Sequence, residues 1–371
     1  MQKILISALA YDGGKSGIAN YIENVVTALS KHRKIDLIVN KEEVKFFEGI
    51  SENIEFKVVS KLFKKPLFNA LWHLLVLPFS IDKRQYEWMF LPAGNRRLMA
   101  FYPLRTFVTM HDLSQYQVDK KYDALRMFYI KKVIPFFLKR ADKIFTVSEN
   151  TANDMVLHYD MDKSSLVVNH NGVNVTNFFP LKSLETQTLN EGKPYILYVS
   201  RIEHPGKNHL NLIKAYEKLP QEYKEKYDLC LVGSDWNGAE VVHAYAESSN
   251  DSRHIKFLGF VDNNQLPAYY RQASLFVFPS FYEGFGIPVV EAMASGVPIA
   301  ISSTSSLPEV GGDATLYFKP NDVDDISIVM KSVLEDKALA KRMVQKGFIQ
   351  MKKFNWDTHA QIILDNSTFA K

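Results

Sequence analysis

The sequence predicts an α/β protein of two domains. At 371 residues the chain is longer than a single hydrophobic core usually organises. Apolar stretches of strand length recur along it, and several lead into a glycine-containing loop and then a helix, as in a parallel sheet covered by helices. Hydrophobic residues make up 46% of the chain and charged residues 23%, which is ordinary for a soluble globular protein.

Residues 273–296 show this pattern most clearly. The apolar stretch 273–278 predicts a strand that ends at Pro279, and the loop after it contains two glycines. Pro288 predicts the first turn of a helix, where its missing N–H has no partner to lose, and Gly296 predicts the helix end. A glycine loop that enters a helix presents free backbone N–H groups and a positive dipole end, which favour a phosphate.

Two carboxylates bracket this expected anion site. Glu283 lies before the glycines, and Glu291 lies within the first turns of the helix. Carboxylates repel phosphate, so we expect them to accept hydrogen bonds from neutral hydroxyls beside it. A phosphate beside several hydroxyls indicates a nucleotide-sugar. A helix start with capping acids is the alternative, and it accounts for Glu291 but not for the paired glycines.

The start of the chain predicts a second loop of this kind. Residues 3–10 predict a strand, and the loop 11–17 that follows contains Gly14 and Gly17. The next segment has apolar residues at the i, i+3, i+4, i+7 spacing of a helix packed on a sheet. The loop therefore falls at the carboxyl edge of the sheet, where open α/β sheets bind their ligands.

A further strand in the first half ends in two residues that can carry chemistry. Residues 104–110 predict this strand, and His111 and Asp112 follow it directly. A His-Asp pair at a strand exit has a structural role in many proteins. Its place at the carboxyl end of a strand makes it a functional candidate here.

Charge is distributed unevenly along the chain. Residues 1–185 hold 26 Lys and Arg against 19 Asp and Glu, whereas the remainder holds 19 against 22. A basic first half suggests either an anionic partner such as lipid headgroups, a pyrophosphate or nucleic acid, or a basic face that is simply solvated. Residues 57–106 combine basic pairs with apolar residues, which predicts either an amphipathic helix on an anionic membrane or a core helix with basic flanks. Residues 120–140 predict a helix with further cations beside aromatic residues.

The second domain is expected to begin after a linker at residues 181–193, which show no periodicity. Residues 195–200 predict its first strand, and Arg201 and Lys207 lie just beyond that strand. Arginine offers a planar fork of donors and lysine a mobile point charge. The pair therefore suits a diphosphate whose charge increases as it leaves.

The stretch Glu283-Gly-Phe-Gly-Ile-Pro-Val-Val-Glu-Ala-Met-Ala-Ser-Gly-Val-Pro298 resembles the signature of the retaining glycosyltransferases with the GT-B fold, family GT4. The resemblance extends over nearly the whole chain and is strongest in residues 195–312. It implies two Rossmann-like domains facing a cleft, with a C-terminal helix that crosses back to the first domain. The implied boundaries are 1–185 for the acceptor domain, 186–350 for the nucleotide-sugar domain and 351–371 for the returning helix.

The resemblance also implies a role for each candidate residue. Glu291 should bind the ribose hydroxyls and Glu283 the hexose hydroxyls, while Arg201 and Lys207 stabilise the diphosphate. The loop with Gly14 and Gly17 should lie against the donor phosphates and the acceptor. His111 should line the reacting face, with Asp112 orienting it or the acceptor. Backbone contacts to the donor are implied for Gly284, Phe285, Gly286 and Ile287.

The implied reaction is transfer of a hexose from a nucleotide diphosphate sugar to a hydroxyl of a growing cell-surface polysaccharide. Mannose is favoured as the hexose, and the acceptor is expected to be lipid-linked through a pyrophosphate. No metal or other cofactor is expected, and nucleic acid is not expected as a partner. The alternatives are a nucleotide-sugar epimerase of the same fold and a non-catalytic module that binds a nucleotide or a glycan.

The cellular location can be predicted only in outline. Cys230 is the single cysteine of the chain and cannot form an internal disulfide, which fits a reducing compartment. The first ten residues are followed at once by a polar glycine loop, so we expect a buried strand there rather than a signal peptide. The longest apolar stretch, 67–79, is too short to span a bilayer. We therefore expect a cytoplasmic protein that can contact the inner face of the plasma membrane.

Overall fold

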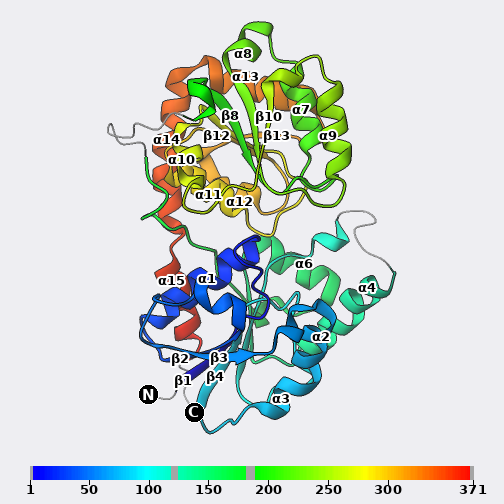
Figure 1. Cartoon of the computed structure of the whole chain (residues 1–371), viewed down its shortest axis with the longest axis vertical. Coiled ribbons are helices and arrows are strands. Elements are labelled where there is room, and N and C mark those ends of the chain that lie inside the picture. Colours follow the sequence, from blue (N-terminus) through cyan, green and yellow to red (C-terminus); the bar gives the residue numbers. More distant parts are fainter. Residues whose placement is uncertain (1–2, 118–123, 181–188, 368–371) are drawn as a thin grey trace. The chain divides into compact units, whose positions relative to one another are not determined.

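The computed structural model describes residues 3–117, 124–180 and 189–367, which fall into two compact units. Unit 1 comprises Met1–Asn171 and Trp356–Lys371, and unit 2 comprises Gly172–Asn355 (Figure 1). The chain thus enters unit 2 earlier than the expected boundary at 185/186, and it returns to unit 1 at 356 rather than 351. Most of the expected linker, residues 181–188, lies outside the described residues.

The described residues of unit 1 form a parallel sheet of seven strands in the order β3-β2-β1-β4-β5-β6-β7. The inner strands β2 and β5 are buried along their whole length, which is the expected pattern for a parallel sheet covered on both faces. The strands are β1 Lys3–Ser7, β2 Ile35–Asn40, β3 Ile54–Val59, β4 Tyr86–Leu91, β5 Thr106–Met110, β6 Lys143–Thr146 and β7 Leu166–Val168.

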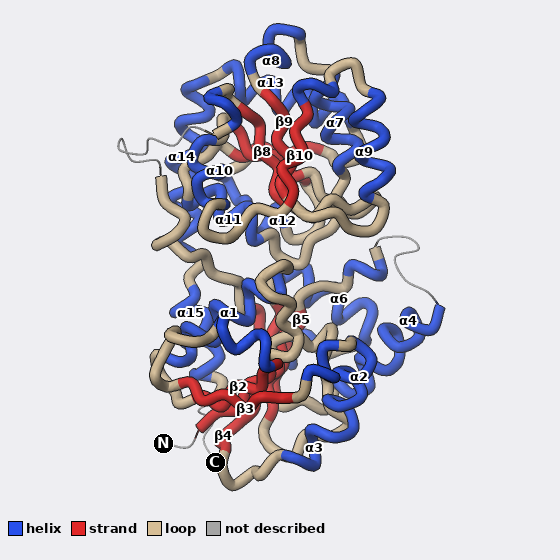
Figure 2. The backbone as a smooth tube through the Cα atoms, in the orientation of Figure 1, coloured by secondary structure: helices blue, strands red, loops and turns tan. Residues whose placement is uncertain are grey.

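The helices of unit 1 cover this sheet, as the tube in Figure 2 shows. The predicted helix after the first loop is α1, Gly17–Ser30, and its apolar stripe is buried from Tyr21 onwards. Two further helical segments each contain a π-helical turn, Trp72–Val76 between α2 and α3 and Tyr129–Val133 between α4 and α5. The remaining bounds are α2 Pro66–Leu71, α3 Leu77–Ser80, α4 Ala124–Phe128, α5 Ile134–Leu138, α6 Glu149–Tyr159 and α15 Trp356–Asp365.

The C-terminal helix α15 is held in unit 1 by a chain of buried hydrogen bonds. The hydroxyl of Tyr21 on α1 lies 2.9 Å from Thr109 Oγ1 and 2.9 Å from His359 Nε2, and His359 Nδ1 lies 2.8 Å from the carbonyl of His170. That carbonyl can only accept, so Nδ1 carries the proton of the neutral ring. Tyr21 therefore donates to Nε2 and accepts from Thr109. Burial lowers the pKa of His359 to about 4, which keeps the ring neutral.

Unit 2 is built on a parallel sheet whose described strands have the order β10-β9-β8-β11-β12-β13. The strands are β8 Tyr195–Val199, β9 Asp228–Val232, β10 Ile255–Gly259, β11 Leu275–Phe278, β12 Ile299–Ser302 and β13 Leu316–Phe318. The helices are α7 His209–Glu217, α8 Gln221–Lys226, α9 Ala239–Ser248, α10 Leu266–Gln272, α11 Ile287–Ala294, α12 Leu307–Gly311, α13 Val323–Glu335 and α14 Lys337–Gln350.

The strand order reverses at one point in each sheet. In unit 1 this point lies between β1 and β4, and in unit 2 it lies between β8 and β11. Loops leave a sheet in opposite directions at such a point and open a crevice at its carboxyl edge, which is where doubly wound folds bind ligands. The two loops that the sequence singles out, 11–17 and 279–286, both follow strands at these points. Among the described helices, none combines the length and apolar character that crossing a bilayer requires.

Candidate functional site

The strongest candidate residues lie at the strand reversal of unit 2. Lys207 follows β8 and Glu283 follows β11, and their side chains form an ion pair with Nζ 2.7 Å from Oε1. Both side chains are largely buried, so neither charge is well solvated except by its partner. A ligand that binds this pair can take over one charge or both without first removing much water.

Two direct hydrogen bonds, and a tyrosine hydroxyl that contacts both, hold the Lys207 loop against the loop after β11. The N–H of Phe281 donates to the carbonyl of Gly206, and the Asn208 amide donates to the carbonyl of Pro279. The hydroxyl of Tyr198 on β8 donates to the Lys207 carbonyl over 2.7 Å, so Ser280 donates in its 3.3 Å contact with that hydroxyl. Lys207 is therefore placed by its backbone, independently of the ion pair.

The glycine loop also rests on the loop that follows β12. Ser305 Oγ accepts from the Glu283 N–H over 3.0 Å, and the Ser306 hydroxyl lies 3.0 Å from the carbonyls of Glu283 and Phe285. Gly286 has φ of +101° at the start of α11, and a Cβ there would lie 2.8 Å from a methyl carbon of Leu307. The position therefore requires glycine for both its backbone conformation and its space.

Glu291 lies on the second turn of α11 and is buried. One of its carboxylate oxygens accepts a hydrogen bond of 3.0 Å from the hydroxyl of Tyr270 on α10. Tyr270 is fully buried, and this burial, together with the carboxylate, raises its pKa well above the ordinary value. Tyr270 therefore stays protonated and fixes the rotamer of Glu291, a contact that the sequence did not predict.

Arg201, at the end of β8, is half exposed. Its guanidinium carbon lies 4.8 Å above the centre of the Trp236 ring, and one guanidinium nitrogen lies 3.4 Å from Glu203 Oε2. The aromatic face and the carboxylate hold the guanidinium in place at this edge of the sheet. The structure thus brings Lys207 together with Glu283, and Arg201 together with Trp236 and Glu203.

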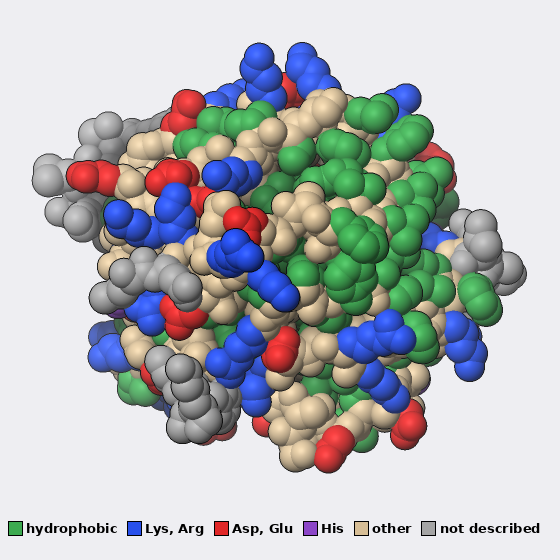
Figure 3. Space-filling model, turned by 90° about the horizontal axis from the view of Figure 1, so that it is seen from below, with side chains coloured by type: hydrophobic (Ala, Val, Ile, Leu, Met, Phe, Trp, Pro, Cys, Tyr) green, Lys and Arg blue, Asp and Glu red, His purple; other side chains and the backbone are tan. Residues whose placement is uncertain are grey.

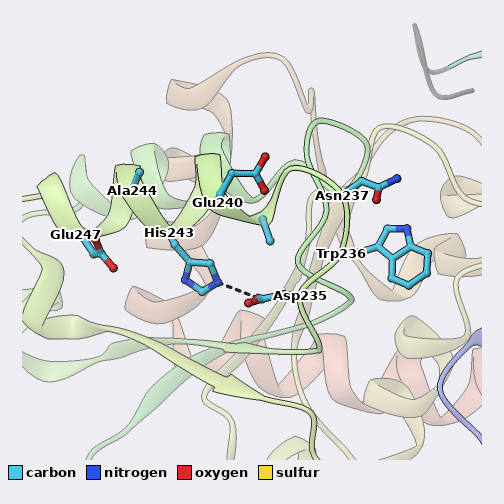
Figure 4. Close-up of a pocket in the computed structure, with 8 residues that line it drawn as sticks. Asp235, Trp236, Asn237, Glu240, His243, Ala244 and Glu247 are labelled. Carbon is cyan, nitrogen blue, oxygen red and sulfur yellow. Dashed lines mark hydrogen bonds and ion pairs between the residues drawn. The ribbon is translucent and has the colours of Figure 1, made fainter.

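Two open hollows lie at the ends of β9 and β10, next to Arg201. One, of about 690 Å³, extends along α9 past Trp236, and Figure 4 shows the 2.8 Å bond between His243 and Asp235 at its wall. The other, of about 470 Å³, also contains the Asp235–His243 pair in its lining, which is otherwise made up of Ile202, Gly233, Ser234, Phe257, Gly259 and Phe260. No predicted site residue lines either hollow.

Gly233 sets the floor of the smaller hollow. Its φ is +152°, and a Cβ there would lie 1.9 Å from the carbonyl oxygen of Ser200. Only glycine lets the ends of β8 and β9 approach this closely. The hollow therefore opens beside the same strand end that carries Arg201.

In unit 1, His111 lies at the carboxyl end of β5 and is buried. Its N–H donates to Asn95 Oδ1 over 2.9 Å, and its ring lies edge-on to Tyr21 at 4.6 Å. Ring atom Nε2 lies 2.7 Å from the carbonyl of Pro92, which can only accept, so Nε2 carries the proton. Burial lowers the pKa of His111 to about 4 despite that bond and the nearby Asp112 charge. At neutral pH the ring is neutral, and Nδ1 is a hydrogen-bond acceptor.

Asp112 closes a local turn directly after His111. Its carboxylate accepts from the N–H and the hydroxyl of Ser114, two residues on. The Pro92 carbonyl and the Tyr21 ring hold the imidazole of His111. A carbonyl that accepts from a histidine leaves no pattern in the sequence, which explains why this contact could not be predicted.

The first glycine loop is more open. Gly14 has φ of +83°, whereas Gly17 is the first residue of α1 and has open space where a Cβ would lie. Ser16 caps the helix by accepting from the Ala19 N–H. Arg96, at the other side of the strand reversal, donates to the Ala10 carbonyl and lies 3.7 Å from Asp12. The loop therefore leads into the start of α1 and contacts the Arg96 side chain.

Within the described residues, no group of His, Cys, Asp and Glu side chains is arranged to hold a metal ion. The polar atoms at the unit 2 edge instead come from an arginine, a lysine and two carboxylates placed among hydroxyls and backbone amides. Such a set is chemically suited to a polyhydroxylated anion: the cations suit phosphate, and the carboxylates suit hydroxyls.

Two family models match the chain. The model of glycosyl transferases group 1 matches residues 182–350, and the model of glycosyltransferase family 4 matches residues 15–177. The two matches together include every residue discussed in this section except Ala10, Asp12 and Gly14.

Known proteins resemble the chain in sequence and in fold. The O-antigen chain mannosyltransferase B of Escherichia coli is 30% identical, and the alignment covers 92% of this chain and 93% of that protein. The serotype-specific mannosyltransferase WbdA of Escherichia coli is 34% identical over 72% of this chain, which spans about a third of WbdA. The sucrose-phosphate synthase of Thermosynechococcus elongatus has the same fold, with a TM-score of 0.79 at 20% identity and coverage of 99% and 98%. This likeness confirms the predicted GT-B fold.

Proposed function

This chain belongs to the family 4 glycosyltransferases and is a hexosyltransferase, and on that premise we propose that it transfers mannose to a growing surface polysaccharide. The donor is a nucleotide diphosphate mannose, with GDP favoured as the nucleotide. The two sequence relatives described above are mannosyltransferases, and one of them acts on the O-antigen chain, which supports mannose as the hexose and a polysaccharide as the product.

The Lys207–Glu283 ion pair is the observation that carries this proposal. It joins the expected phosphate ligand to the expected hexose ligand at the strand reversal of unit 2. We assign Lys207 and Arg201 to the diphosphate and Glu283 to the hexose hydroxyls. Glu291, with one oxygen fixed by Tyr270, binds the ribose hydroxyls. The backbone of Gly284, Phe285, Gly286 and Ile287, at the start of α11, contacts the donor.

The smaller hollow beside Arg201 suits the nucleobase. Its apolar walls, Ile202, Phe257 and Phe260, can stack on a ring, and Asp235 supplies a carboxylate beside them. Guanine presents two adjacent donors, N1–H and the N2 amino group, to such a carboxylate, whereas uracil presents only one. The hollow therefore supports GDP over UDP.

The reaction retains the configuration at the sugar carbon. The bond from C1 to the diphosphate oxygen breaks, a bond from C1 to the acceptor oxygen forms on the same face, and the acceptor proton passes to the leaving diphosphate. Arg201 and Lys207 stabilise the negative charge that develops on that diphosphate, and such electrostatic stabilisation is commonly the largest catalytic term. The role of the cations requires no metal ion.

We assign the acceptor side to unit 1. His111 offers Nδ1 as an acceptor for a sugar hydroxyl, since its Nε2 proton is held by Pro92. The loop with Gly14 and Gly17 and the neighbouring Arg96 suit an anionic group of the acceptor. A lipid pyrophosphate would supply that group and would place the enzyme at the cytoplasmic face of the membrane.

The test is a transfer assay with GDP-mannose, UDP-glucose and other nucleotide sugars, with a lipid-linked oligosaccharide as acceptor and NMR analysis of the product linkage. We expect a single α-mannosyl residue from GDP-mannose, since that donor has the α configuration. A β-linked product would contradict retention, and transfer from a UDP-sugar alone would contradict the assigned donor.

The two alternative functions predict different products. An epimerase would release an epimer or a free sugar without an acceptor, and a binding module would give no product at all. The relatives are transferases, so neither alternative gains support from them. Sugar release that is independent of acceptor and faster than transfer would revive the epimerase.

A further inference from the structure

Tyr21 on α1 is fully buried, and its ring lies among three other aromatic rings of unit 1. Its centre is 4.6 Å from that of His111, 5.3 Å from that of His359 and 5.8 Å from that of Trp356, and each pair is arranged edge to face. In Figure 3 the exterior is covered by hydrophobic and charged side chains, to which these four residues contribute almost nothing because all are buried. The contacts of Tyr21 therefore lie in the interior, where β5 ends.

The spacing of residues along β5 explains how Tyr21 reaches His111. Side chains two positions apart on an extended chain point to the same face of the sheet, so Thr109 and His111 share a face. Thr109 Oγ1 donates to the Tyr21 hydroxyl over 2.9 Å, and the His111 ring contacts the Tyr21 ring. One tyrosine thus contacts this part of the chain twice, with its hydroxyl on Thr109 and its ring on His111.

The His111 ring needs the second contact to keep its plane. Its Nε2 proton is donated to the Pro92 carbonyl over 2.7 Å, which fixes one atom of the ring. A ring held by one hydrogen bond alone is free to turn about that bond, and such a turn changes the direction of Nδ1. The Tyr21 ring stands at 84° to the His111 ring, so the turn would drive the two rings into each other. Tyr21 therefore fixes the direction in which Nδ1 accepts a hydrogen bond.

The C-terminal helix α15 in turn fixes Tyr21. His359 Nε2 accepts from the Tyr21 hydroxyl over 2.9 Å, although the two residues are 338 positions apart in the sequence. The far end of α15 is tied to the start of β5, because Arg105 donates to the carbonyls of Asn366 and Ser367 over 3.1 and 2.9 Å. The helix is thus attached near both ends of β5, and it holds the Tyr21 hydroxyl in a set position relative to that strand.

We propose that Tyr21 is a positioning residue for sugar transfer: it fixes the His111 ring so that Nδ1 meets a hydroxyl of the acceptor, and His359 on α15 fixes Tyr21 for that task. The inference rests on the proposed function, which assigns His111 to the acceptor. Tyr21 has no exposed surface and does not touch a substrate, so its effect on transfer passes through His111. The last helix of the chain thereby takes part in acceptor recognition.

A purely structural role is the rival of this proposal. The bonds from Thr109 through Tyr21 to His359 would then serve only to attach α15. The two roles use different parts of the tyrosine, because attachment depends on the hydroxyl whereas orientation of His111 depends on the ring. They also differ in how variants combine: two residues that act through one another have non-additive effects, whereas independent effects add.

The test measures mannose transfer from GDP-mannose to the lipid-linked oligosaccharide by the full-length protein. Tyr21→Leu, which removes the ring, should lower kcat/KM for the acceptor at least about tenfold, because a displaced His111 ring misplaces its hydrogen bond. Tyr21→Phe keeps the ring and should lose less than about threefold. GDP affinity in isothermal titration should be unchanged in both variants, since the donor residues belong to unit 2. Tyr195→Phe, which removes a buried hydroxyl from the Tyr269 carbonyl in unit 2, is the matched control and should change nothing.

Combination with His111→Ala separates the two roles. The double variant Tyr21→Leu/His111→Ala should transfer at the rate of His111→Ala alone, within about twofold. A further tenfold loss in the double variant would overturn the proposal. If circular dichroism shows that Tyr21→Leu does not fold, His359→Leu takes its place in the comparison, because Tyr21 then keeps its ring but loses the group that fixes it.

A conservative change tests the part of α15. The amide of a glutamine at position 359 can accept from Tyr21 and donate to the His170 carbonyl, as the histidine does. His359→Gln should therefore keep transfer within about twofold of the wild type, whereas His359→Leu should lower it about threefold. Equal rates in these two variants would overturn the contribution of α15.

Nuclear magnetic resonance of protein with isotope-labelled histidine gives a readout that needs no substrate. The two ring nitrogens of His111 should give separate, narrow resonances in the wild type and broadened ones in Tyr21→Leu, because the ring can then turn. Resonances in Tyr21→Leu as narrow as in the wild type would overturn the positioning role. Broadened resonances in that variant, together with no transfer by the wild-type enzyme, would refute the proposed function and leave the orientation of His111 by Tyr21 standing.

Discussion

The two units have the same kind of sheet, with the strand order reversed beside its first strand, yet they place different chemistry at that point. At the reversal in unit 2, the structure gathers opposite charges, with Lys207 on Glu283 and Arg201 near Glu203. In unit 1, Arg96 lies near Asp12 at the reversal itself, and buried neutral groups lie at the end of the neighbouring strand β5. There His111 and His359 both face Tyr21, and their pKa values are lowered to about 4. The fold is thus the same and the electrostatics differ.

This difference shows which edge can hold a highly charged ligand. A diphosphate needs cations that are fixed before it arrives, and unit 2 fixes Lys207 through its carbonyl and through Glu283. Neutral imidazoles form hydrogen bonds with hydroxyls and, because they carry no charge, do not attract an anion. The comparison therefore supports the proposed binding of the donor by unit 2 and of a sugar hydroxyl by His111.

The largest expected effect comes from removing a charge at the unit 2 edge. Lys207→Ala or Glu283→Ala should lower kcat/KM for transfer at least about a hundredfold, as for loss of a positioned transition-state contact. The double variant should lose less than the product of the two, because the residues interact directly. Lys218→Ala is the matched control, since it breaks an exposed pair with Asp324 and should leave the rate unchanged. Full activity of Lys207→Ala or of Glu283→Ala would refute the proposed role of these two residues in transfer.

The glycines of the two loops should respond differently to alanine. Gly286→Ala should destabilise unit 2 by about 2 kcal/mol, because a Cβ would clash with Leu307 at a positive φ. Gly17→Ala should leave stability unchanged or raised by about 1 kcal/mol, since α1 has open space there. Thermal unfolding of the two variants measures both effects. Equal stability of Gly286→Ala and Gly17→Ala would contradict the expectation that only the second loop requires glycine.

The neutral network of unit 1 predicts a dependence on pH. A histidine with a folded pKa of about 4 and an unfolded pKa of about 6.5 contributes its full stability above pH 6.5, and this is lost as pH falls towards 4. At pH 5 the loss is about 2 kcal/mol for His359. Urea unfolding at pH 7.5 and pH 5 should show this loss, and His359→Gln should reduce the difference by about that amount. If His359→Gln leaves the difference in unfolding free energy between pH 7.5 and pH 5 unchanged, the pKa of His359 is not lowered in the folded protein.

The smallest expected effect concerns the ribose contact. Glu291→Gln keeps the shape of the side chain and its bond to Tyr270, but it removes the charge that strengthens hydrogen bonds to hydroxyls. Nucleotide affinity should fall about tenfold, with kcat nearly unchanged. Isothermal titration with GDP measures the affinity. A large fall in kcat with unchanged affinity would move Glu291 to the reacting centre.

Periodicity and loop composition predicted much of the fold. The strand and helix predicted within residues 3–29 are β1 and α1 of the structure, and those predicted within residues 273–296 are β11 and α11. These elements could be predicted because the spacing of apolar residues and the positions of glycine and proline reflect local backbone geometry. Strand order could not be predicted from the residues alone, since parallel pairing joins distant segments.

The sequence predicted the charged residues of the candidate site but not the groups to which they form hydrogen bonds. The roles of Arg201, Lys207, Glu283 and Glu291 were predicted from residue type and family resemblance. The bonds from Tyr270 to Glu291 and from His111 to the Pro92 carbonyl join segments 21 and 19 residues apart, and nothing in the sequence marks them. Residues 57–106 predict either a membrane-surface helix or a core helix, because their hydrophobic pattern does not say which side of a helix faces the sheet.

Hydrogen–deuterium exchange of the full-length protein, with and without saturating GDP-mannose, tests the central claim most directly. The claim is that the charged edge of unit 2 holds the donor. The predicted result is slower exchange of backbone amides in residues 201–208 and 283–291, and little of this protection in Lys207→Ala. Saturated binding with unchanged exchange in both segments would contradict the claim and place the donor elsewhere.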